Sequence, residues 1–156
     1  MDTNDPLKER LRRWTLILGV LQITAGCFVG LIPPTAVAWF RGIVMAHLEF
    51  CANGTLMIVL GLLVREMNLS PDALKAWFVT LQLGTWLNGG AGVLAAFLGA
   101  SSKLLPTANE KFPPPGGDHH PLVTASLLIC GVNILAALIL SLVGLVRGKG
   151  LESGRC

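Results

Sequence analysis

Four long apolar stretches alternate with short polar segments along this chain. A membrane-spanning helix needs about 20 mostly apolar residues, because each residue rises about 1.5 Å across a hydrocarbon core of about 30 Å. Four expected spans meet or nearly meet this length, at residues 14–31, 43–64, 76–98 and 122–146. The pattern therefore predicts an all-α fold, an integral membrane four-helix bundle.

Local signals mark several helix ends. Pro33 and Pro34 follow the first span, and Arg65 ends the second. Ser70 as N-cap, with Pro71 at the first helical position, predicts the start of the third helix.

Residues 99–121 are rich in Pro and Gly and predict an irregular connection before the fourth span. An alternative for the first span is a cleaved signal peptide, but its length and the lack of an A-x-A-like site favour a retained helix. We expect a single membrane domain over residues 1–156, because this length leaves no room for a second domain of normal size.

Composition supports a membrane protein. Hydrophobic residues make up 53% of the 156 residues and charged residues only 13%, against roughly 25% charged in typical soluble domains. This excludes an ordinary soluble globule and a disordered chain. No basic stripe with interleaved aromatic residues is present, so we expect no nucleic-acid partner.

The basic residues predict the orientation, because loops rich in Lys and Arg stay in the cytosol. Nine of the twelve fall on the side of the two termini, namely Lys8, Arg10, Arg12, Arg13, Arg65, Lys75, Arg147, Lys149 and Arg155. The other side has Arg41, Lys103 and Lys111. Both termini are therefore expected in the cytosol, and a bacterial inner membrane and a eukaryotic internal membrane fit equally well.

The cysteines form no C-x-x-C pair, so we expect free thiols packed as small apolar residues, with metal ligation or a disulfide as alternatives. They are Cys27, Cys51, Cys130 and Cys156. His119 and His120 follow Asp118 in the 99–121 connection, where they are either solvated or part of a metal site.

Two ionisable residues, His47 and Glu49, lie inside the expected spans. Each costs at least about 2.5 kcal/mol at a helix centre, and less near the membrane surface. His47 is either an interfacial histidine, a metal or haem ligand, or a proton carrier. Glu49 is either a paired structural carboxyl or a site residue, and Asn53 is either a helix–helix contact or a site residue.

Helical geometry separates these side chains. Glu49 and Asn53 are four residues apart and share a face, whereas His47 and Asn53 differ by about 120° around the axis and about 9 Å along it. A compact site would need a neighbouring helix or subunit. We expect Glu49 to bond to a polar residue of the third or fourth span, or to contact a cofactor edge.

The third span combines polar and small residues, which indicates either internal packing or a homo-oligomer contact. Its polar residues are Gln82, Thr85, Trp86 and Asn88, and the small faces that favour a homo-oligomer are at Gly89, Gly92 and Ala96. The first span adds Gly26-x-x-x-Gly30, a common contact motif.

The stretch Ala46-His47-Leu48-Glu49-x-x-x-Asn53-Gly54 resembles the signature of the hydroxylaminobenzene mutase family, in which A-H-L-E-G-x-x-N-G opens the second of four membrane helices. Gly84-Thr85-Trp86-x-Asn88 is similar to the family's G-T-Y-x-N pattern. The resemblance covers about residues 10–148. It implies an isomerase that converts a small aromatic substrate, an arylhydroxylamine, to an ortho-aminophenol.

A wider resemblance reaches styrene oxide isomerase, which shares the spacing of His47 and Asn53. It implies a trimer with non-covalent haem b between subunits, His47 as axial iron ligand, and iron acting as a Lewis acid. Asn53 would orient the substrate oxygen, with Glu49 as a further catalytic candidate. This chain has no tyrosine where the isomerase uses one, so Trp86, Asn88 or Gln82 would shape the pocket.

Two other functions stay open. A haem-binding electron-transfer subunit often uses two axial histidines, and only one lies inside an expected span here. A non-enzymatic membrane assembly protein would use the polar residues for helix contacts alone and would bind no cofactor.

Overall fold

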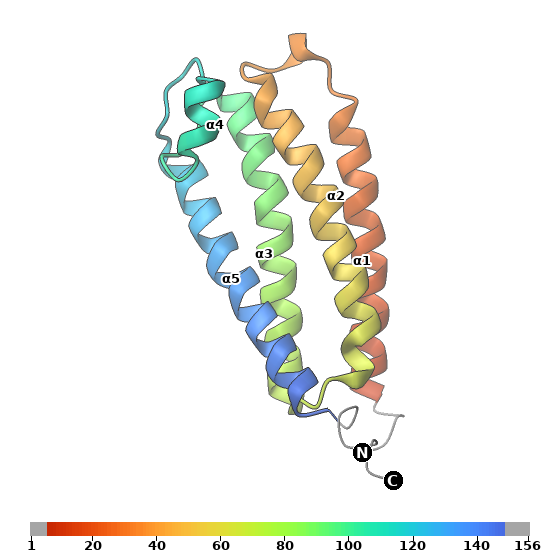
Figure 1. Ribbon diagram of the computed structural model, residues 1–156. Coiled ribbons are helices and arrows are strands. Elements are labelled where there is room, and N and C mark those ends of the chain that lie inside the picture. Colours follow the sequence, from red (N-terminus) through yellow and green to blue (C-terminus); the bar gives the residue numbers. More distant parts are fainter. Residues whose placement is uncertain (1–5, 149–156) are drawn as a thin grey trace.

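Every regular element of the described part of the chain, residues 6–148, is helical (Figure 1). In the computed structural model the order is α1 (Pro6–Gly30), η1 (Pro34–Ala36), α2 (Phe40–Leu63), η2 (Val64–Glu66), α3 (Pro71–Leu98), α4 (Pro106–Lys111) and α5 (Pro121–Val146). The all-α prediction is confirmed. The four long helices cover the four apolar stretches.

The long helices stand in the order α1, α2, α3, α5, with α1 and α5 at opposite edges (Figure 1). The main contacts join α1 to α2, α2 to α3, and α3 to α5. The arrangement is thus an open row of helices, which differs from a closed four-helix bundle. It gives α2 and α3 neighbours on two sides each, so their polar residues can face different partners.

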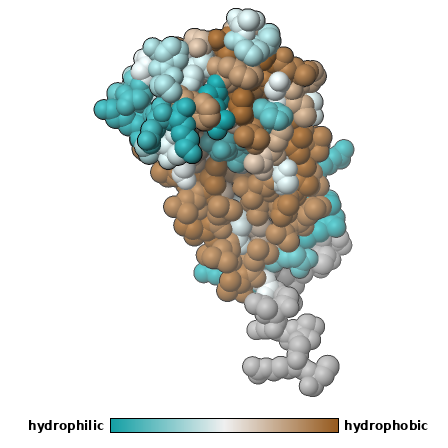
Figure 2. Space-filling model, turned by 45° about the horizontal axis from the view of Figure 1, so that its top comes forward, coloured by the Kyte–Doolittle hydropathy of each residue, from teal (hydrophilic) through white to brown (hydrophobic). Residues whose placement is uncertain are grey.

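Three helices, α1, α2 with η2, and α5, are long and apolar enough to cross a membrane. Helix α3 has 28 residues but does not meet this measure, since polar side chains and glycines interrupt its apolar sequence. Large apolar side chains point outward along the row, and Phe28 and Val132 are each 69% exposed. Figure 2 shows this apolar surface, with hydrophilic residues gathered towards the end formed by residues 99–121. Such a surface suits contact with lipid.

Helix α3 begins as its sequence predicts. The Ala73 amide donates to Ser70 Oγ at 3.3 Å, and Pro71 takes the first helical position. The helix ends at Gly99, whose φ of 66° lies in the left-handed region that glycine adopts without strain. Three helices begin three to eight residues before the expected spans, because hydropathy detects the apolar part of a helix and not the whole hydrogen-bonded helix.

The start of α1, η2 and the end of α5 meet at one end of the molecule (Figure 1). Arg65 bonds to Glu9 at 2.9 Å, and Asn68 Nδ2 donates to the Arg147 carbonyl at 3.1 Å. An apolar core lies beside these contacts, where the Trp77 indole donates to Ser141 Oγ at 2.8 Å. Lys149, Arg155 and Cys156, which entered the sequence-based predictions, lie outside the described residues.

The connection 99–121 is more ordered than expected, so the prediction of an irregular segment is partly wrong. It contains the six-residue helix α4, with Pro106 in its first turn. Asn109 Nδ2 donates to the Ser102 carbonyl at 2.8 Å, and the Trp39 indole donates to the Phe112 carbonyl at 3.1 Å. Side chains thus donate hydrogen bonds to backbone carbonyls that in a regular helix would accept from backbone amides.

Small residues of α3 face α2 within the same chain. A β-carbon on Gly92 would lie 2.9 Å from the Ala46 nitrogen, and one on Gly89 would meet the Phe50 ring. A β-carbon on Gly42 of α2 would lie 2.6 Å from the Ala96 nitrogen. The expectation that these α3 positions offer an oligomer contact is therefore wrong, because the close α2–α3 approach already uses them.

Candidate functional site

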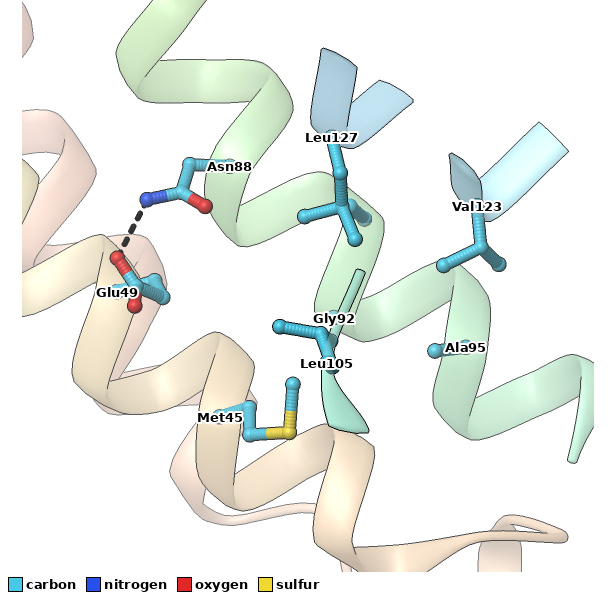
Figure 3. A pocket seen from close by; sticks show the side chains of 9 residues that line it. Met45, Glu49, Asn88, Gly92, Ala95, Leu105, Val123 and Leu127 are labelled. Carbon is cyan, nitrogen blue, oxygen red and sulfur yellow. Dashed lines mark hydrogen bonds between the residues drawn. The ribbon is translucent and has the colours of Figure 1, made fainter. Parts of the chain in front are cut away.

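The polar residues of α2 and α3 meet at Glu49. Asn88 Nδ2 donates to Glu49 Oε2 at 2.5 Å, and Asn53 Nδ2 donates to the same oxygen at 3.3 Å (the Asn88 bond is drawn in Figure 3). The expected hydrogen bond between Glu49 and a polar residue of the third long helix is confirmed. The expected shared face of Glu49 and Asn53 is confirmed as well.

The two oxygens of Glu49 are not equivalent. Both amides donate to Oε2, and no hydrogen bond within residues 6–148 ends on Oε1. An ionised carboxylate has acceptor sites on both oxygens. The carboxylate is therefore anchored by one oxygen, and the other is available to a ligand.

Glu49 and Asn88 form the polar part of a pocket between α2, α3 and α5 (Figure 3). Its volume is about 360 Å³, counting the space open at its mouth. It is lined by Met45, Glu49, Asn88, Ala91, Gly92, Ala95, Leu105, Val123 and Leu127. Apolar walls with a few convergent polar groups are typical of small-molecule sites.

Asn53 supports this pocket without lining it. The residue is only 7% exposed and lies one helical turn from Glu49 on α2. The hydrogen bond that its side-chain amide donates to the carboxylate explains how a polar side chain is accommodated in a buried position.

Trp86 lies apart from the pocket. It packs edge-on against Phe50, with 5.8 Å between ring centroids and 63° between ring planes. Trp86 and Asn88 are two positions apart in the sequence, about 200° around the axis, so their side chains leave α3 in nearly opposite directions. The structure therefore brings Glu49, Asn53 and Asn88 together and leaves Trp86 elsewhere.

His47 faces α1. Its Nδ1 lies 2.8 Å from the Gly26 carbonyl, and a carbonyl only accepts, so Nδ1 carries the proton and donates. In the neutral imidazole, Nε2 then keeps the lone pair that can coordinate a metal. A β-carbon on Gly30 would lie 2.9 Å from Nδ1, so the Gly26-x-x-x-Gly30 motif is used within the chain. The predicted separation of His47 from Glu49 and Asn53 is confirmed.

Other chemical groups add little to this site. Cys27, Cys51 and Cys130 are free thiols. Cys27 is exposed, contrary to the expectation that it packs inside. The described residues contain no group of three or more His, Cys, Asp or Glu side chains that could hold a metal ion.

Several site residues escaped the sequence interpretation. Met45, Val123, Leu127 and Leu105 line the pocket, yet in sequence they look like any apolar residue of a span or loop. Only the packing of the helices distinguishes these residues from their neighbours.

Comparison with known proteins gives three matches. The sequence profile of the styrene oxide isomerase family matches residues 11–146. Hydroxylaminobenzene mutase HabB of Ectopseudomonas oleovorans is 34% identical over 106 residues, which are 68% of this chain and 62% of HabB. Hydroxylaminobenzene mutase HabA of the same organism is 35% identical over 136 residues, which are 83% of this chain and 94% of HabA. No solved structure matches.

Proposed function

Because the chain belongs to the styrene oxide isomerase family, it is an enzyme of the isomerase or mutase type, and we propose that it rearranges a small arylhydroxylamine to an ortho-aminophenol. Both matched relatives are named as hydroxylaminobenzene mutases. The observation that carries the proposal is the Glu49–Asn88 pair at the polar part of an apolar pocket.

The proposed reaction needs no external reactant. The N–O bond breaks, a C–O bond forms at the ortho carbon, and the ortho hydrogen leaves as a proton while the nitrogen gains one. Product and substrate have the same atoms. The protein therefore has to hold the ring, exclude water and carry one proton between two atoms of the substrate.

Glu49 is suited to carry that proton. Its Oε2 is held by Asn88 and Asn53, so the carboxylate stays in one orientation. In our proposal Oε1 takes the ortho proton and returns it to the nitrogen. The apolar walls of the pocket hold the aromatic ring and limit access of water.

His47 fits the role of a ligand to a non-covalent haem b. The hydrogen bond that Nδ1 donates to the Gly26 carbonyl orients the ring and leaves the Nε2 lone pair for a metal, the arrangement that metal-binding histidines use. When bound, haem iron supplies a Lewis acid that draws electron density from the substrate oxygen and so weakens the N–O bond. In the proposal Asn53 acts through its hydrogen bond to Glu49, which helps to hold the carboxylate in one orientation.

We further propose that the site is completed between protomers of a homotrimer. Within one chain, His47 faces α1, whereas the Glu49 pocket lies between α2, α3 and α5. A second protomer could bring its His47 to this pocket. The open row of helices supports such an assembly, because its edges leave room for a neighbour.

We also propose a multi-pass topology with four crossings and cytosolic termini. The described basic residues support it: Lys8, Arg10, Arg12, Arg13, Arg65, Lys75 and Arg147 lie towards the end where α1 starts and α5 ends, and Arg41, Lys103 and Lys111 lie towards the other. This asymmetry agrees with the preference for basic cytosolic loops.

The test is conversion of phenylhydroxylamine to 2-aminophenol by detergent-purified protein, followed by chromatography. Glu49→Gln keeps the shape but cannot take the proton, so we expect kcat to fall at least about 100-fold. Glu66→Gln is the matched control, because Glu66 is exposed at the opposite end. Equal rates for Glu49→Gln and Glu66→Gln would remove Glu49 from the mechanism.

A further inference from the structure

One wall residue of the pocket comes from outside the long helices. Leu105 belongs to the 99–121 connection and immediately precedes α4, whereas all other lining residues lie on α2, α3 or α5. Along α3 the lining runs from Asn88 to Ala95, about 10 Å at 1.5 Å per residue. The Glu49–Asn88 pair therefore lies at one end of the pocket. Ala95, on the side where α3 leads into the 99–121 connection, lies at the other end.

The α3 wall of the pocket consists mainly of small residues. Ala91, Gly92 and Ala95 carry at most a methyl group, while Val123 and Leu127 of α5 form a facing wall. A planar ring can lie along such a surface with its heteroatoms towards Glu49. The far edge of that ring then points towards the connection.

We propose that Leu105 is a specificity-determining residue, which limits the substrate to a single aromatic ring without a bulky para substituent. The inference rests on the proposed function, since it takes the pocket as the substrate site. The ring's nitrogen and oxygen face Glu49 and Asn88, and its para position faces Leu105. Removing the Leu105 side chain lengthens the pocket.

Leu105 can be changed without loosening the connection. The backbone is held by bonds that do not involve its side chain: the Leu105 amide donates to the Ser102 carbonyl at 3.0 Å, and the Asn109 amide donates to the Leu105 carbonyl at 3.0 Å. Ser102 Oγ lies 2.9 Å from Thr124 Oγ1, which ties the connection to α5. The neighbouring Leu104 is 49% exposed and does not line the pocket, so it provides a matched control.

The experiment compares kcat/KM for 4-tert-butylphenylhydroxylamine with that for phenylhydroxylamine. We expect Leu105→Ala to raise this ratio about 10-fold, which is within the change in kcat/KM that one or two apolar carbons cause in a hydrophobic pocket. Leu105→Phe should lower the ratio, and Leu104→Ala should leave it unchanged. A ratio that is the same in Leu105→Ala, Leu105→Phe and Leu104→Ala would overturn the inference.

A binding assay separates this inference from the proposed reaction. Aniline and 4-tert-butylaniline cannot rearrange, and their binding is read from the thermal stabilisation of the purified protein. Stronger stabilisation by 4-tert-butylaniline in Leu105→Ala, and in no other variant, supports the pocket assignment even if no arylhydroxylamine is converted. A lack of conversion would contradict only the proposed reaction. Turnover without any dependence on Leu105 in either assay would overturn the pocket assignment and leave the reaction standing.

Discussion

At the scale of single residues, α2 places two kinds of chemistry on different sides of one helix. His47 donates through Nδ1 to the Gly26 carbonyl of α1, and Glu49 accepts from Asn88 of α3. Both side chains are partly withdrawn from water, and each has a partner that orients it. If α2 crosses a membrane, as proposed, its polar groups are costly, so two oriented ones suggest two functional roles.

His47→Ala should remove the Soret band and the activity together, because no other histidine of the described residues lies in a long helix. The measurement is the absorption spectrum and the rate of protein expressed with ample haem. His119→Ala should change neither, since His119 is exposed in the 99–121 connection. Full haem occupancy with an unchanged spectrum in His47→Ala would contradict the assignment.

At the scale of elements, the α2–α3 contact holds the Glu49–Asn88 pair together. Gly42 and Gly92 let the two backbones approach closely, and their neighbours are backbone atoms that no rotamer change can move. This contact therefore decides both the packing of the row and the geometry of the pocket. In the proposed membrane topology, lipid offers no hydrophobic drive for helix association, so close packing has to stabilise the contact.

Gly42→Ala tests this contact. Its new β-carbon would lie 2.6 Å from the Ala96 nitrogen and 2.8 Å from the Ala96 Cα, so the helices must separate. We expect a loss of about 1–3 kcal/mol, seen as a lower unfolding midpoint in detergent.

Gly90→Ala is the matched control for this change. Apart from its chain neighbours and its own helix backbone, no atom of residues 6–148 lies within 4 Å of a β-carbon at Gly90, and alanine favours a helix over glycine. Its midpoint should be unchanged or raised. Equal midpoints for the two variants would show that the α2–α3 contact is looser than described.

At the scale of the whole molecule, the open row leaves the proposed site divided between two faces of a protomer. Coexpression of His47→Ala with Glu49→Gln tests whether a neighbour completes it. If a site combines His47 of one protomer with Glu49 of the next, random mixing restores about a quarter of the sites. The measurement is turnover by the copurified oligomer, with each variant alone as the inactive reference. No recovery in an oligomer that contains both chains would place the whole site within one protomer.

The sequence alone determined the helical class, the positions of the long helices and the direction of the polar side chains on α2. These follow from local rules: about 20 apolar residues span a membrane, Ser70-Pro71 starts a helix, and 100° per residue separates His47 from Asn53. The partner of Glu49 was also predictable as a polar residue of the third or fourth span, because a withdrawn carboxyl needs a donor.

Only the tertiary structure decided which helices meet. In sequence the α3 glycines fitted either internal packing or a contact with another chain, because a small-residue surface looks the same in both cases. The structure shows that α2 of the same chain packs against them. The position of Leu105 in the pocket depends on how residues 99–121 fold back through Trp39, Ser102 and Thr124, contacts far apart in the chain. Long-range packing of this kind leaves no periodic signal in a single sequence, so the outline of the pocket emerged only when the helices were placed together.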